Sequence, residues 1–168
     1  MLAVLACFVI GDARADDLAE ALGEPYYTGR IIPTPQKCRL LSSELTLADA
    51  NLHQARAAIL LDAKSPGAIR FGAEEFADRI ARAAELTEFS VREWDGSTAP
   101  PGFDAYIAVG LAGDKSLSGL SGYDRAWEGE SRPEGYHIRP TRIGAHPALL
   151  VAGNDARGAF YGLSLIHI

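Results

Sequence analysis

The chain has 168 residues, of which 48% are hydrophobic, and this length allows one domain with a sizeable core. Its 22 acidic and 16 basic residues give a formal charge of -6 at pH 7, which argues against nucleic acid or an anionic membrane surface as a partner. No apolar run is long enough to span a bilayer, so no membrane is expected as a partner once the N-terminal signal is removed.

The first 15 residues, MLAVLACFVIGDARA, predict a secretory signal peptide, because an apolar stretch at 2–10 precedes a small-residue site at 13–15. The usual basic start is missing, so either the start codon lies further upstream or the signal is unusually short. An ordinary buried strand is the alternative. We expect a flexible mature terminus at 16–29 and a secreted or periplasmic protein. Cleavage would leave Cys38 alone, which excludes an internal disulfide and a structural zinc site.

Hydrophobic periodicity then predicts a series of short strands and two helices. In chain order, these are strands at 37–41, 44–47 and 57–62, a helix at 65–86, strands at 89–94, 104–110, 136–139 and 148–152, and a helix from Ala156. The first helix has an apolar face that includes Phe76 and Ile80. On its other face, Glu75 can pair with Arg79 and Asp78 with Arg82.

Two loops separate the later strands. Pro100 lies in the loop at 95–102, and a second loop at 111–132 is long for a compact domain, which indicates a partly helical segment or a binding feature. Tyr123 and Trp127 within it could stack on a sugar ring, although aromatic residues more often anchor a loop to the core.

The segment 133–162 organises the end of the chain. Pro140 is expected to end the strand that begins at Tyr136, because proline donates no ladder hydrogen bond. After the covered strand at 148–152, Asn154 or Asp155 can cap the closing helix. Gly158 and Gly162 leave one helix face almost without side chains, so close packing is expected there, either against the sheet of this domain or against a following domain.

Two motifs resemble a known kind of domain. "EGYHI" followed by "LLVAGNDARGAFYGL", together with "IIPTPQK" at 31–37, resembles the small α/β domain that precedes the catalytic barrel in secreted glycosidases. The similarity is greatest to β-N-acetylhexosaminidases of glycoside hydrolase family twenty, with O-GlcNAcase-like hyaluronidases and α-glucuronidases as cousins. It covers residues 30–163. The resemblance implies a non-catalytic N-terminal domain acting in carbohydrate metabolism, whose partner is the barrel of the same polypeptide.

This resemblance also implies where the chemistry is. Family twenty enzymes use an adjacent aspartate and glutamate on the barrel, and this chain contains no Asp-Glu dipeptide and lacks the roughly 250 residues of a barrel. We therefore expect no catalytic, cofactor or metal site and no activity from this chain alone. The last letters, LSLIHI, are also one translated frame of a transposase library adaptor, so residues 164–168 are expected not to come from the natural gene.

Other candidate residues favour ordinary structural roles. Glu74 and Glu75 diverge on a helix and cannot flank one bond. The histidines lack metal-ligand spacing, and the glycines before Lys115 lack the order of a phosphate loop. No serine lies in a Gly-x-Ser-x-Gly elbow. The histidines His53, His137 and His146 are therefore read as surface or loop residues, and Gly110, Gly113 and Lys115 as an ordinary turn. Ser42 and Ser43 are among the serines outside such an elbow.

The sequence predicts an α+β fold, with a mixed, largely antiparallel sheet and two main helices on one face. The residues expected to pack against a barrel are Arg157, Gly158, Phe160, Tyr161 and Gly162, with Arg157 held by Asp155 or by a barrel loop. This hypothesis predicts an uncovered glycine-lined patch. The alternative is a free-standing carbohydrate-binding or adhesion module with a sugar-stacking cleft.

Overall fold

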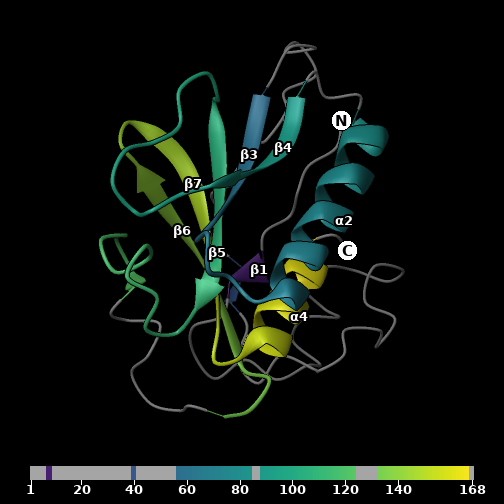
Figure 1. Cartoon of the computed structure of the whole chain (residues 1–168), viewed down its shortest axis with the longest axis vertical. Coiled ribbons are helices and arrows are strands. Elements are labelled where there is room, and N and C mark those ends of the chain that lie inside the picture. The colour runs from purple at the N-terminus through teal and green to yellow at the C-terminus, as the bar shows by residue number, and fades with distance from the viewer. Residues whose placement is uncertain (1–6, 9–38, 41–55, 85–87, 124–131, 167–168) are drawn as a thin grey trace.

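The computed structural model describes residues 7–8, 39–40, 56–84, 88–123 and 132–166 (Figure 1). Within these ranges lie a five-stranded sheet, two helices and a separate two-residue pairing of β1 (Cys7–Phe8) with β2 (Arg39–Leu40). The predicted strand at 44–47, the motif at 31–37, Cys38, His53 and Trp127 lie outside the described residues. The signal peptide therefore stays a prediction.

The sheet has the strand order β4-β3-β5-β7-β6. Its members are β3 (Arg56–Leu61), β4 (Glu88–Glu93), β5 (Ala105–Leu111), β6 (Tyr136–Ile143) and β7 (His146–Gly153). The inner strands β3, β5 and β7 are covered on both faces over almost their whole length, as their unbroken apolar runs predict. The expected mixed sheet is confirmed.

The strand directions differ from the prediction of a largely antiparallel sheet, which is wrong. Three of the four pairings, β3 with β4, β3 with β5 and β5 with β7, are parallel, and β6 with β7 is antiparallel. The helix α2 (Gly67–Ala84) connects β3 to β4, and a helical crossover returns the chain in the same direction. The antiparallel pair is a tight hairpin that turns at Gly144, where φ is 60°.

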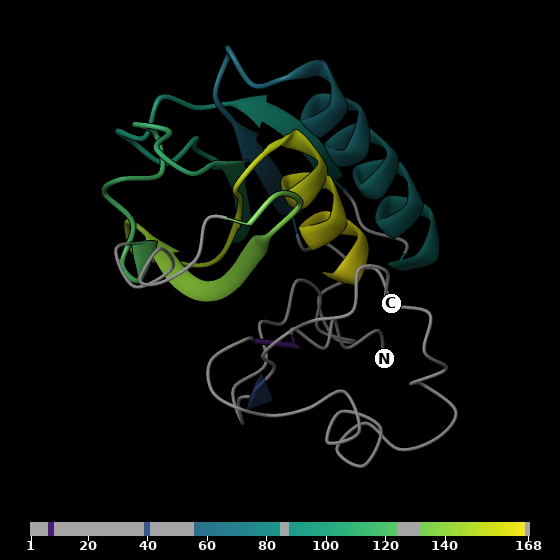
Figure 2. The same ribbon diagram turned by 90° about the horizontal axis from the view of Figure 1, so that it is seen from below.

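Both helices lie side by side on one face of the sheet, as predicted (Figure 2). The second helix, α4, spans Ala156–Ile166. One core cluster fills the space between the helices and the sheet and includes Ile69, Phe76 and Ile80 of α2 and Leu163 of α4. On α2, Glu75 pairs with Arg79 as predicted, at 3.4 Å. The next expected pair differs, because Arg82 Nε donates to the main-chain carbonyl of Asp78 at 3.0 Å.

Loops cover the opposite face of the sheet with a second core cluster. Tyr123 is 8% exposed, and its hydroxyl accepts a hydrogen bond from the N–H of Gly113 at 2.7 Å. From Ala112 to Gly122 the predicted long loop runs mainly in turns, and Leu111 still belongs to β5. Tyr123 is therefore a loop anchor, which is the structural alternative expected for it.

Pro140 does not end its strand, which corrects that expectation. It lies inside β6 and stands opposite Leu149 of β7 in the antiparallel register. Because β6 is an edge strand, the backbone nitrogen of a proline there can face away from β7, so its missing N–H costs no ladder hydrogen bond. The strand continues through Thr141 and Arg142 to Ile143, and its buried residues are Ile138, Thr141 and Ile143.

Candidate functional site

The start of α4 and the start of β6 form one hydrogen-bonded junction. Asp155 caps the helix as predicted, since its Oδ1 accepts from the N–H of Gly158 at 2.8 Å. Its Oδ2 accepts from the N–H of Glu134, also at 2.8 Å, so one carboxylate links two distant segments. These two donors, Glu134 first, hold the pKa of Asp155 below its ordinary value.

Neighbouring main-chain contacts close the same junction. The N–H of Asn154 donates to the carbonyl of Gly135 at 2.8 Å, and the Asn154 side-chain amide donates to the carbonyl of Arg132 at 2.7 Å. Glu134 has a φ of 62°, a conformation that costs a residue with a side chain free energy. The surrounding hydrogen bonds hold the backbone of Glu134 in that conformation.

As expected, a carboxylate holds Arg157. Its partner is Glu134, where Asp155 or a barrel loop was expected. Its guanidinium pairs with Glu134 at 3.0 Å, whereas Asp155 uses its oxygens as main-chain acceptors. The Arg157 side chain is 77% exposed, so the pair is well solvated. Solvent and salt screen such an exposed pair, so it contributes little to stability.

Gly158 and Gly162 are buried, which corrects the expectation that they form an uncovered patch. A β-carbon on Gly158 would overlap the carbonyl oxygen of Gly135, and one on Gly162 would stand 2.7 Å from Val151 Cγ1 and 3.5 Å from Tyr136. The glycine face of α4 thus packs on the β6–β7 hairpin of its own domain. The expected packing partner was either the sheet of this domain or a following domain, and the structure shows the sheet.

Phe160 and Tyr161 are half-buried, with their rings edge to face at 6.2 Å. Phe160 lies across Gly72 of α2, where a β-carbon would stand 2.6 Å from its ring. A groove of about 390 Å³ runs between α2 and α4 at this contact. Its lining residues are Phe71, Gly72, Glu75, Phe76, Arg79, Phe160, Leu163 and Ser164.

Phe71 is the feature of this groove that the sequence reasoning missed. Its side chain is 60% exposed, the one exposed large hydrophobic residue among those the structure describes. The available signal was its position on α2, because Phe71 falls on the polar side, away from the face made by Ile69, Ala73 and Phe76. We name Phe71, Phe160 and Tyr161 the aromatic face.

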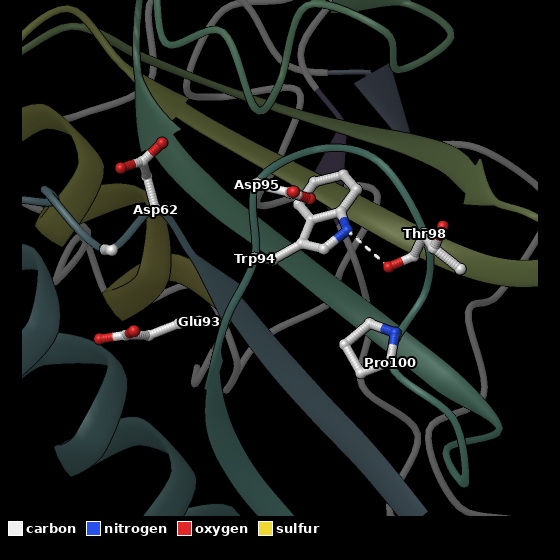
Figure 3. A pocket seen from close by; sticks show the side chains of 7 residues that line it. Asp62, Glu93, Trp94, Asp95, Thr98 and Pro100 are labelled. Carbon is white, nitrogen blue, oxygen red and sulfur yellow. Dashed lines mark hydrogen bonds between the residues drawn. The ribbon is translucent and has the colours of Figure 1, made fainter.

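A second cavity, of about 430 Å³, opens at the carboxyl ends of β3 and β4 (Figure 3). Asp62 follows β3 directly, and Trp94 and Asp95 follow β4. Ligands commonly bind at this edge of a parallel sheet, which is the signal that could have located it from sequence. The lining residues are Asp62, Ala63, Glu93, Trp94, Asp95, Thr98 and Pro100.

The carboxylates of this cavity serve the local loops. Asp62 accepts from the N–H of Lys64 at 2.8 Å, and Glu93 pairs with Arg70 of α2 at 3.3 Å. The hydroxyl and the N–H of Ser97 both donate to Asp95. These two hydrogen bonds, the one from the hydroxyl having the larger effect, lower the pKa of that carboxyl.

Trp94 is 6% exposed, and its indole N–H donates to the carbonyl of Thr98 at 3.1 Å, so most of the ring belongs to the core (Figure 3). A sugar ring needs an open aromatic face on which to stack, and Trp94 offers little of one.

The remaining candidates lie apart from one another. Glu74 and Glu75 are exposed on α2, and Lys115 is exposed in a turn. His137 is partly buried on β6, and this burial lowers its pKa, while His146 packs edge to face on Tyr106 at 5.6 Å. Within the described ranges, no group of three or more His, Cys, Asp or Glu residues could hold a metal ion, and no helix there is long and apolar enough to cross a membrane.

Comparison with solved structures gives distant likenesses to 11 chains, one of which is described here. No protein-family model matches the chain, and no curated protein is similar to it. A solved structure of a family GH115 4-O-methyl-α-glucuronidase, with specificity for decorated arabinogalactans, is similar over 68% of this chain with a TM-score of 0.45 and 15% identity. The similar region covers 14% of that enzyme. The chain therefore shows a distant structural similarity to a glycoside hydrolase over part of its length.

Proposed function

We propose that this chain is a non-catalytic N-terminal domain of a secreted glycoside hydrolase, closest in kind to the β-N-acetylhexosaminidases. Its role is to brace the catalytic barrel of the same polypeptide. The domain contacts the barrel through the aromatic face, with Arg157 at its edge. Gly158 and Gly162 are not part of the proposed contact surface, because they pack α4 against the β6–β7 hairpin of its own domain.

The observation that carries this proposal is the exposure of Phe71, which lines one groove with the half-buried Phe160, whose ring meets Tyr161 at 6.2 Å. An aromatic residue that is 60% exposed on a helix already packed on its sheet adds little to the core of this domain. Clustered apolar surface of this kind is typical of a protein interface. The groove beside Phe71, with the Glu75–Arg79 pair on its wall, offers an apolar centre next to charged groups, which is how interfaces between domains are commonly built.

The motifs behind the glycosidase resemblance support the same proposal. "EGYHI" and "GNDARGAFYG" contact each other in the junction of Asp155, Glu134 and Gly135. The motif residues thus fix where α4 leaves the sheet, and α4 carries two members of the aromatic face. A resemblance that includes this junction therefore includes the element that would present the aromatic face to a barrel.

The natural gene provides the test. Its nucleotide sequence beyond codon 163 should continue as an open frame into a (β/α)8 barrel of about 250 residues with an adjacent aspartate and glutamate. An immediate stop codon after the closing helix, or an open frame without a barrel, would refute the proposed function.

A further inference from the structure

No further inference is drawn: the strongest candidate, the cavity at the carboxyl ends of β3 and β4 ringed by Asp62, Glu93 and Asp95, is an acidic cluster engaged by its own loops and by α2, and nothing in the described part of the chain points to a ligand there.

Discussion

Gly158 of α4 lies directly against the main-chain carbonyl of Gly135, and a β-carbon on Gly158 would overlap that oxygen. The contact brings the first turn of the closing helix onto the segment that leads into β6. Because the obstacle is main chain, it cannot move aside as a side-chain end can. Glycine fits this position because there is no space for a β-carbon, although glycine is a poor helix former.

We predict that Gly158→Ala destabilises the fold. Alanine gains about 1 kcal/mol of helix propensity, but the overlap with Gly135 should cost more, leaving a net loss of about 1–3 kcal/mol. Urea unfolding at fixed pH measures it. The control is Gly67→Ala at the first residue of α2, where a β-carbon meets nothing within 4 Å and stability should be equal or slightly higher. Equal stability of the Gly158 variant and the parent would contradict the packing argument.

The positive φ of Glu134 can be isolated by comparing two substitutions. Glu134→Ala and Glu134→Gly both remove the ion pair with Arg157, but only glycine adopts a φ of 62° without a penalty. The glycine variant should therefore be more stable than the alanine variant by about 1 kcal/mol in thermal or urea unfolding. If alanine were equal or better, the backbone at this position would not be strained.

Asp155 should make stability depend on pH in the acid range. Folding lowers its pKa below the ordinary value, because its oxygens accept from the N–H groups of Glu134 and Gly158, so the native state binds fewer protons than the unfolded state. The stabilisation from this group is full above the unfolded value and is lost as the pH falls through the lower folded value. Relative to the parent, Asp155→Ala should cost about 1 kcal/mol at neutral pH, and the difference should shrink below about pH 4.

Asp155→Asn is the matched control for that measurement. Asparagine also caps helices, so this variant should lose less stability than the alanine variant at neutral pH. It carries no titrating group at the position, so its stability should lack the acid-range loss that Asp155 contributes to the parent. A difference between the parent and Asp155→Ala that stayed constant down to pH 2 would show that the carboxylate does not support the junction.

Phe71 and Phe76 provide a matched pair on one helix. Phe71→Ser should change the free energy of unfolding by no more than about 0.5 kcal/mol, because the side chain is already 60% exposed. Phe76→Ala should cost about 3–5 kcal/mol, because Phe76 is 4% exposed in the core. Phe71→Ser should also weaken the binding of a hydrophobic dye to the isolated chain. Unchanged dye binding would mean that the aromatic face is not an accessible apolar surface.

Titration with chitin or glucuronoxylan fragments separates the accessory domain from a free-standing carbohydrate-binding module. Tyr123 and Trp94 are 8% and 6% exposed, and both use their polar atoms internally, so neither offers a stacking surface. We expect no saturable binding by calorimetry. Saturable binding would favour the carbohydrate-binding alternative.

The elements that could be predicted from sequence are those with strong local patterns. The uniform apolar run in β7, the amphipathic periodicity of α2 and the cap at Asp155 each depend on near neighbours in the chain, and the structure confirms all three. The glycosidase role and the secreted location stay proposals.

The errors concern contacts between distant segments. The partner of Arg157 is Glu134, and the surface that covers Gly158 is the main chain of Gly135, neither of which local spacing reveals. Pro140 was misjudged for the same reason, since its tolerance depends on β6 being an edge strand. The sequence did contain a signal for the parallel directions. A strand, a helix and a strand follow one another around α2, and a helical crossover of this kind joins parallel strands.

Oxidative footprinting of Phe71 tests the central claim most directly, because it reports whether protein covers the aromatic face. The measurement compares the isolated chain with the full product of the natural gene. We predict that Phe71 is oxidised readily in the isolated chain and is protected several-fold in the full product, while Phe76 is protected in both. Equal oxidation of Phe71 in the two proteins would contradict the account, since the aromatic face would then lie open in the complete protein.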